Sequence, residues 1–281
     1  MYKFEKAVVR TPADSFAEGI TPGLFGKADP ELAKIQHKKY IQALRQCGLE
    51  VIVLEPDNDF PDSCFVEDPV IVTDRVAILT NFHAPTRKGE VDRILPTIKD
   101  IYGSHIERIE GPGTVEGGDI CQVENHFFIG LSQRTNEEGA CQLAAILKKY
   151  GFTSSIISIR ALPEILHLKT CMSYIGENTF ILQKAILKES ELAPFKKIVV
   201  PDNEGYASNC IRVNDTVILP EGFDETIKQT RAAGFNVLET PMSEFMKQDG
   251  GLSCLSLRIP SSICKIIRNH ISFSYLSGWG V

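Results

Sequence analysis

The sequence lacks any apolar segment long enough to cross a bilayer, because its longest apolar runs, such as 51–54, are no longer than a strand. Its first ten residues are interrupted by charged side chains, so we expect no secretory signal. Basic residues are not in excess either: 30 Lys and Arg stand against 36 Asp and Glu, a net charge of −6. These absences argue against a membrane protein and against a general binder of nucleic acid.

Paired cysteine motifs are missing as well. The cysteines form no CxxC pair and have no histidine pair nearby at zinc-ligand spacing, so we predict no structural metal site. In a chain of this length without a secretory signal, reduced thiols in the cytoplasm are the default expectation. Most of the thiols are then expected to be small core side chains. The eight cysteines are Cys47, Cys64, Cys121, Cys141, Cys171, Cys210, Cys254 and Cys264.

The composition is that of a globular protein, with 43% apolar and 23% charged residues, and 281 residues are enough to bury a large core. We expect a single domain over residues 1–265. The remaining residues, 266–281, form a C-terminal tail that we expect to be disordered.

The sequence contains a faint internal repeat. Amphipathic stretches at 31–47, 91–102, 136–150 and 225–233 each end next to a glycine and precede a β-rich run. For the first stretch, Asp29 is the expected N-cap, Pro30 the first helical residue and Gly48 the residue after the C-cap. Pro96 predicts a kink or a late start in the second. One more unit is expected between the third and the fourth of these stretches. Its helix must lie near 184–193, where no glycine follows the helix.

After each β-rich run comes a polar loop, and one residue of each loop serves as a marker of the repeat. The five markers are Asp68, Asp119, His167, Asn209 and Cys254, at successive separations of 51, 48, 42 and 45 residues. Five strand–loop–strand–helix units are hard to fit to a doubly wound sheet. We predict instead an α/β fold in which five units form a ring and present their polar loops to a common centre.

The centre of such a ring would collect a thiol, an imidazole and several carboxylates. The residues are Glu67, Asp68, Glu116, Asp119, His167 and Cys254. Cysteine, histidine and an acid are the elements of nucleophilic catalysis. Carboxylates around a thiol raise its pKa and so reduce the fraction of reactive thiolate. The excess of carboxylates therefore predicts a substrate that brings positive charge. A guanidinium would pair with carboxylates in planar, forked geometry and would favour the thiolate once bound.

Each of these signals has a structural alternative. A single cysteine near the end of a chain is usually a core residue, and His167 between two leucines is by itself more often a satisfied core histidine. The Gly-Gly-Asp segment at 117–119 is by itself a turn. Only their shared position in the repeat units favours the catalytic interpretation.

Six motifs in order make the chain recognisable. They are FPDSCFVEDP at 60–69, GTVEGGD at 113–119, SQRTN at 132–136, LHLKT at 166–170, ASNCI at 207–211 and DGGLSC at 249–254. With these motifs the chain resembles bacterial dimethylarginine dimethylaminohydrolases, of the guanidino-group-modifying (pentein) superfamily, from about Val8 to Ile259. The resemblance implies a five-bladed α/β propeller with pseudo-fivefold ββαβ-type repeats around a central active site.

The resemblance also implies roles for single residues. Cys254 matches the nucleophile, His167 the general acid and base, and Glu116 the acid that completes the triad. The substrate-binding residues that it implies are Asp68 for the guanidinium, Glu67 as its neighbour in the pocket, Arg87 and Arg134 for the substrate carboxylate, Asp62 for the amino-acid end, and Ile20 as a lid residue. From the residues alone, Arg87 and Arg134 would be solvated surface side chains and Asn136 a helix cap.

The implied reaction is hydrolysis of Nω-methylated arginine to citrulline and a methylamine, through an S-alkylthiouronium on Cys254 and without a metal or organic cofactor. A small molecule is then the expected partner, and the chain a monomer or a homodimer. The closest alternative is a deiminase that releases ammonia from arginine or another guanidine. A non-catalytic propeller is a more distant alternative, since a pure binder has no reason to keep Cys254, His167 and Glu116 together.

Overall fold

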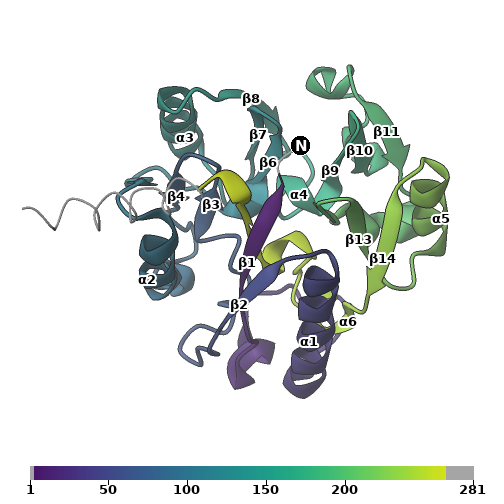
Figure 1. The fold of residues 1–281 in the computed structure, drawn as a ribbon, viewed down its shortest axis with the longest axis horizontal. Helices are drawn as coiled ribbons and strands as arrows, with labels where there is room; N and C mark the ends of the chain where they lie inside the picture. The colour runs from purple at the N-terminus through teal and green to yellow at the C-terminus, as the bar shows by residue number, and fades with distance from the viewer. Residues whose placement is uncertain (1–2, 264–281) are drawn as a thin grey trace, which may run out of the picture.

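The fold consists of five small sheets arranged around a centre, with helices at the rim (Figure 1). This computed structural model describes residues 3–263, so the predicted tail at 266–281 and Cys264 lie outside the described residues. The strands are β1 (Phe4–Arg10), β2 (Glu50–Leu54), β3 (Val70–Val72), β4 (Ala77–Leu79), β5 (Ile106–Arg108), β6 (Ile120–Val123), β7 (His126–Leu131), β8 (Thr153–Ser158), β9 (Met172–Gly176), β10 (Thr179–Leu182), β11 (Lys196–Val199), β12 (Ile211–Val213), β13 (Thr216–Pro220), β14 (Asn236–Thr240) and β15 (Leu257–Pro260).

Every sheet has the same order and the same strand directions. The sheets run β3-β4-β5, β6-β7-β8, β9-β10-β11, β12-β13-β14 and β15-β1-β2. In each, the first strand is antiparallel to the middle one, and the middle strand is parallel to the third. A parallel pair needs a crossover, which explains why each repeat carries a helical segment between its last two strands. The predicted ring of five α/β units is confirmed.

Four crossovers are α-helices: α1 (Pro30–Gln46), α2 (Glu90–Tyr102), α3 (Glu137–Lys149) and α5 (Asp224–Ala232). Two single-turn helices, α4 (Leu168–Cys171) and α6 (Ser243–Met246), precede β9 and β15. The predicted ends of α1 are confirmed: the Asp29 carboxylate accepts from the N–H groups of Glu31 and Leu32, and Gly48 has a φ of +88°. Asn136 caps α3 by accepting from the N–H of Gly139.

The late start, one of the two alternatives predicted at Pro96, and the helix predicted at 184–193 were wrong. Helix α2 begins at Glu90 and continues through Pro96, so there is no late start; Pro96 and Asp92 are exposed, and water can hydrate the carbonyl that proline leaves without a donor. No α-helix forms at 184–193, where the structure has the 3₁₀ turns η4 (Lys184–Ile186) and η5 (Ser190–Leu192). The buried side chains there, Ile186 and Leu192, are six residues apart, a spacing that does not share one helical face.

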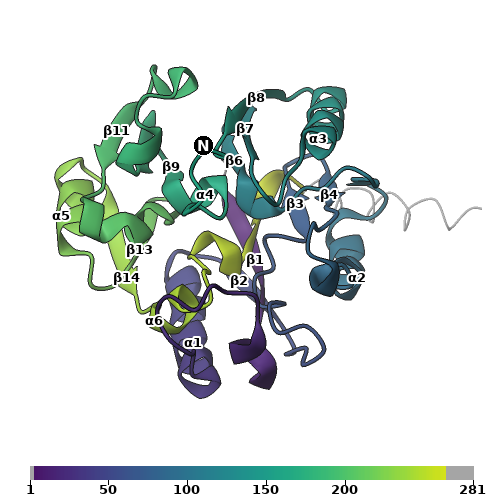
Figure 2. The same ribbon diagram turned by 180° about the vertical axis from the view of Figure 1, so that it is seen from behind.

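The ring is closed by strands from opposite ends of the described chain, since β15 pairs with β1. The turn between β12 and β13 adds a second link at this closure. There the Asn214 side chain accepts from the N–H of Phe4 at 2.9 Å and donates to the carbonyls of Phe4 and Cys47 at 3.3 and 2.9 Å. Seen from behind, α1 and α6 lie side by side below the centre (Figure 2).

The first strand of every sheet borders a central cavity of about 160 Å³. Its lining includes Ile71 of β3, Cys121 of β6, Ser173 of β9, Arg212 of β12 and Arg258 of β15. The loops that carry the five markers of the repeat come directly before these strands. The polar loops therefore meet at one end of the central cavity. Within residues 3–263, no helix combines the length and the apolar character needed to span a membrane. The cytoplasmic location and the monomeric or homodimeric state stay predictions.

Replacing Asn214 by alanine removes three hydrogen bonds at the ring closure, each of which contributes about 1 kcal/mol. We expect a loss of about 2–3 kcal/mol in the free energy of unfolding, measured by urea denaturation. Asn178→Ala is the matched control, because Asn178 occupies the equivalent β9–β10 turn, also at positive φ, and donates to a single exposed carbonyl. Equal losses in the two variants would contradict a special role for the closure.

Candidate active site

Eight of the nine predicted site residues line one pocket at the end of the central cavity. The eight are Ile20, Asp62, Asp68, Arg87, Glu116, Arg134, His167 and Cys254. They come from segments that are up to 234 positions apart in the chain (254 − 20 = 234), and the ring brings them together. The pocket is small, about 30 Å³, whereas the larger cavity on the central axis contains neither Cys254 nor His167.

Cys254 lies in a 3₁₀ turn, η7 (Ser253–Leu255), and its Sγ accepts from the N–H of Gly251 at 3.4 Å. The two glycines before it are required sterically. A Cβ on Gly251 would lie 2.2 Å from the side chain of Asn209, and a Cβ on Gly250 would lie 2.2 Å from the Phe65 ring. Asn209 also fixes the turn, because its Oδ1 accepts from the N–H of Ser253 at 3.0 Å.

Burial raises the pKa of Cys254 to about 12, and the charges of Asp68 and Glu67 add to the effect. In the absence of a ligand the group is therefore a neutral thiol at neutral pH. A cation that binds among the carboxylates would lower the pKa of Cys254 again and favour the thiolate.

His167 precedes α4, and its Nε2 lies 2.9 Å from Oε2 of Glu116. Burial lowers the pKa of His167, but the hydrogen bond to Glu116 and the charges of Asp119 and Asp68 outweigh it and raise the pKa to about 9. The imidazole is thus protonated at neutral pH. It has a proton to give to a leaving group, which is the role of a general acid.

Asp68 and Arg87 form a buried ion pair, with Nη1 of Arg87 2.9 Å from Oδ2 of Asp68. The other carboxylate oxygen of Asp68 accepts from the N–H of Gly118 at 3.0 Å. Burial raises the pKa of Asp68, but the charge of Arg87 outweighs it and leaves the pKa below its usual value. Glu90, at the start of α2, holds the opposite edge of Arg87 through two contacts of 2.8 Å. The guanidinium of Arg87 is therefore fixed edge-on to Asp68.

Arg134 is less constrained. Its Nη1 lies 3.7 Å from Oε1 of Glu116, and its guanidinium makes no hydrogen bond within residues 3–263. Oε1 of Glu116 is buried and has no hydrogen-bond partner within the same residues. The pocket thus presents one carboxylate oxygen and one guanidinium that are available to a ligand.

Asp62 connects the pocket to the segment around Ile20. The N–H of Ile20 lies 3.1 and 3.3 Å from the two carboxylate oxygens of Asp62. Burial raises the pKa of Asp62. Ile20 lines the pocket and is 40% exposed, and Leu24 and Phe25 beyond it are more exposed still.

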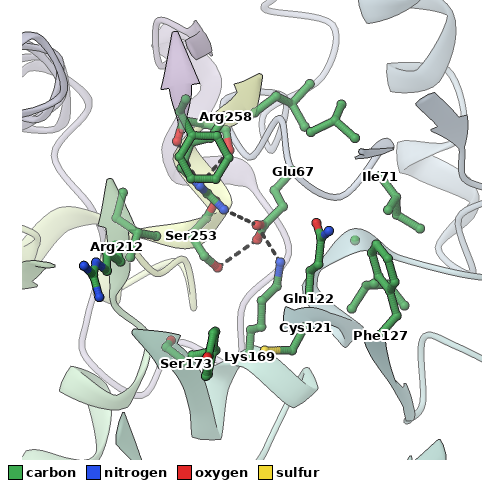
Figure 3. A pocket seen from close by; sticks show the side chains of 18 of the residues that line it. Glu67, Ile71, Cys121, Gln122, Phe127, Lys169, Ser173, Arg212, Ser253 and Arg258 are labelled. Carbon is green, nitrogen blue, oxygen red and sulfur yellow. Dashed lines mark hydrogen bonds and ion pairs between the residues drawn. The ribbon is translucent and has the colours of Figure 1, made fainter. Parts of the chain in front are cut away.

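Glu67 is the one predicted pocket residue that the structure places elsewhere, in the central cavity (Figure 3). Its carboxylate contacts Lys169 at 2.5 Å, Arg258 at 3.1 Å and the Ser253 hydroxyl at 2.7 Å. The prediction of a pocket-lining carboxylate is therefore not met. Glu67 and Asp68 lie in the turn before β3, closed by the hydrogen bond from the N–H of Asp68 to the carbonyl of Phe65, and their side chains lie in different cavities. Glu67 still lies close to Cys254, since its backbone N–H donates to the carbonyl of Cys254 at 3.2 Å.

The pocket includes residues to which no role was given from the sequence: Phe65, Leu166, Gln248, Asp249 and Gly250. Four of them lie inside the recognised motifs, which was the available signal, and Gln248 directly precedes one. Gln248 is buried, and its Oε1 has no hydrogen-bond partner in the described part of the chain. Burial raises the pKa of Asp249.

One group could contact a cation: ligand atoms of Asp68, Glu116 and His167 lie within 4.8 Å of one another. These side chains already have partners in the protein, Asp68 with Arg87 and Gly118, and Oε2 of Glu116 with His167. The protonated imidazole is also a poor metal ligand, because a metal needs its neutral form. We therefore assign no metal to this group and treat it as a site for a cationic part of a substrate.

A buried thiol, a protonated histidine paired with a carboxylate, and carboxylates arranged for a planar cation define a guanidino-group-modifying enzyme of the five-bladed α/β type. Residues 12–211 match the family described as N,N dimethylarginine dimethylhydrolase, eukaryotic. The chain is 45% identical to the N(G),N(G)-dimethylarginine dimethylaminohydrolase of Pseudomonas aeruginosa, over 91% of this chain and 99% of that protein. It belongs to the dimethylarginine dimethylaminohydrolase family.

Solved structures agree with this assignment. The Pseudomonas enzyme, as a cysteine-to-serine variant complexed with citrulline, matches with a TM-score of 0.89 at 43% identity, over 92% of this chain and all of that one. The N-terminal domain of ArgZ, an arginine dihydrolase from cyanobacteria, matches with a TM-score of 0.81 at 22% identity, over 90% and 97% of the two chains. This second likeness shows the shared fold alone.

Glu67→Gln leaves Lys169 and Arg258 without a buried counter-charge, so we expect a loss of about 3–5 kcal/mol in the free energy of unfolding. Because the side chain lies outside the pocket, KM for a methylarginine should change little. Urea denaturation and steady-state kinetics measure the two quantities. Glu137→Gln, which breaks the exposed pair with Arg160, is the control and should leave both nearly unchanged. A raised KM for Glu67→Gln at unchanged stability would show instead that Glu67 acts in substrate binding.

Proposed function

We propose that the protein hydrolyses Nω,Nω-dimethyl-L-arginine, and Nω-methyl-L-arginine, to L-citrulline and the corresponding amine. The observation that carries the proposal is the unpartnered carboxylate oxygen of Glu116 in a pocket that also contains Asp68 and the Cys254 thiol. A buried acceptor without a donor is costly, and a planar guanidinium would supply two donors and a compensating charge. The family relationship supports the same substrate class.

The chemistry begins when the guanidinium binds. Its charge lowers the pKa of the Cys254 thiol, which loses its proton to solvent, and the thiolate adds to the guanidinium carbon. His167 then gives its proton to the departing dimethylamine. The carbon–nitrogen bond breaks, and an S-alkylthiouronium remains on Cys254.

The second half restores the enzyme. Neutral His167 takes a proton from water as the water oxygen adds to the same carbon. The tetrahedral intermediate collapses and the carbon–sulfur bond breaks. The proton of its hydroxyl group passes to the departing sulfur, so citrulline leaves and Cys254 is again a neutral thiol. Glu116 orients His167 throughout, and proton transfer of this kind contributes about 10²–10⁴-fold to the rate.

The amino-acid end of the substrate is assigned to Arg134, Arg87 and Asp62. Arg134 has its donors available, so we propose that it provides the main contact to the substrate carboxylate. Arg87 is held by Glu90 and Asp68, so it contributes its charge and its remaining N–H. We propose that Asp62 accepts from the substrate ammonium.

The test is citrulline release by the purified protein from asymmetric dimethylarginine, monomethylarginine and arginine, for the wild type and Cys254→Ser. We expect turnover of the methylated substrates and its loss in the variant, because the hydroxyl of serine is a far weaker nucleophile here. Cys171→Ser is the control, since Cys171 is buried outside the pocket. A preference for arginine would make the protein a deiminase, and no citrulline from any of the three would overturn the proposal.

Arg134→Met should raise KM for dimethylarginine about 10- to 100-fold with a smaller change in kcat, since a charge-assisted contact of about 1.5–3 kcal/mol is lost. Dimethylagmatine, which lacks the carboxylate, should be turned over equally well by the variant and the wild type. Arg160→Met, at an exposed ion pair, is the control. A matching loss on dimethylagmatine would show that Arg134 does not act through the carboxylate.

A further inference from the structure

Asp119 is a buried carboxylate that contacts the site from behind and is not part of the pocket lining. Its Oδ1 accepts from the N–H of Leu168 at 3.0 Å. Its Oδ2 accepts from the hydroxyls of Ser132 and Thr135, both at 2.7 Å. The side chain is fully excluded from solvent, and Gly130 leaves room for it, since a Cβ there would lie 3.0 Å from Oδ1.

Each of these three partners is connected to a residue of the site, by the chain or by a hydrogen bond. Leu168 follows His167 directly. The Ser132 hydroxyl also accepts from the N–H of Arg134 at 2.9 Å, and the Thr135 hydroxyl from the N–H of Glu116 at 3.2 Å. One carboxylate therefore connects the acid–base group, its carboxylate partner and the cation assigned to the substrate carboxylate.

The hydrogen-bond directions require an ionised Asp119. Both hydroxyls already accept backbone N–H groups, so their own protons point to Oδ2, and Oδ1 receives a third donor. Burial raises the pKa of Asp119, but these three donors and the charge of His167 oppose it. The group thus adds a negative charge next to His167 that no cation of the protein neutralises by direct contact within residues 3–263.

We propose that Asp119 is a positioning residue that fixes His167, Glu116 and Arg134 relative to one another and whose charge keeps His167 protonated when the substrate is bound. The proposal rests on the proposed function for its kinetic part. Other groups that face His167 are the carboxylates of Glu116, Asp68 and Asp249 and, across the pocket, Cys254, Arg87 and Arg134.

Asp119 differs from these carboxylates in what happens on substrate binding. The substrate guanidinium neutralises Asp68 and Glu116, which weakens their hold on the proton of His167, and its own charge repels the imidazolium. Asp119 is shielded from the substrate, so its charge remains. The general acid is therefore still charged at the moment when the amine has to leave.

The first test is the pH dependence of kcat for wild type and Asp119→Asn. Removal of the charge disfavours the imidazolium and lowers the pKa of His167. The fall of kcat at high pH, the alkaline limb of the profile, should therefore move to lower pH by about one unit. At a fixed pH on that limb, kcat should be about tenfold lower. The matched control is Glu204→Gln, because Glu204 also accepts three hydrogen bonds, in its case from two N–H groups and one hydroxyl, but lies in another unit. Glu204→Gln should lower stability and leave the limb in place.

The second test does not depend on the reaction. The pKa of His167 can be followed by NMR of histidine-labelled protein, with His167→Gln to assign its signal among the six histidines. A fall of the His167 pKa in Asp119→Asn supports the proposal even if no methylarginine is hydrolysed, in which case only the proposed function fails. An unchanged His167 pKa with an unchanged alkaline limb in the folded variant overturns the charge role.

If Asp119→Asn does not fold, the positioning role is tested at Thr135. Thr135→Val removes the hydroxyl between Asp119 and the N–H of Glu116 at nearly constant shape, and Thr135→Ser restores it. We expect kcat to fall about tenfold in the valine variant and to recover in the serine variant. Loss of stability with full kcat in Thr135→Val would overturn the positioning role.

Discussion

The pairing of β15 with β1 is the contact on which the site depends. Cys254 lies three residues before β15, whereas Asp68 and Glu116 belong to other units and lie 186 and 138 residues earlier in the chain (254 − 68 and 254 − 116). The pairing is antiparallel and apolar, with Leu257 and Ile259 buried. Without it the thiol would have no fixed relation to Asp68 or His167. Closure of the ring therefore also brings the residues of the site together.

The ring brings many charged side chains close together. The structure divides them between two places, the central cavity and the pocket. Glu67 projects into the central cavity, where Lys169 and Arg258 together more than balance its charge. Asp68 and Glu116 project into the pocket, where their cations are Arg87, His167 and, at 3.7 Å, Arg134. Because Oε1 of Glu116 remains without a donor, the pocket side has room for one more planar cation. Selectivity for a guanidinium thus follows from an incomplete hydrogen-bond set as much as from charge.

The sequence predicted the parts of this arrangement that local chemistry determines. Asp29 and Gly48 predicted the two ends of α1, and the spacing of the repeats predicted the ring. The six motifs, through the family resemblance, predicted eight residues of the pocket. Glu67 could not be placed, because the side to which adjacent residues of a loop project depends on backbone angles that only the closed ring fixes. Asp119 was singled out among the polar centre residues, but its contacts with Ser132 and Thr135 span two strands and were invisible in the sequence.

The resting state of the site follows from two opposite effects of burial. The thiol of Cys254, with a pKa of about 12, is neutral, and His167, with a pKa of about 9, is charged. The usual cysteine–histidine ion pair is therefore absent before the substrate arrives, since the carboxylates favour the imidazolium and disfavour the thiolate at once. Only a ligand that carries positive charge to the thiol reverses the second effect. A neutral urea such as citrulline brings no such charge, so the bound product does not lower the pKa of the thiol as the guanidinium does.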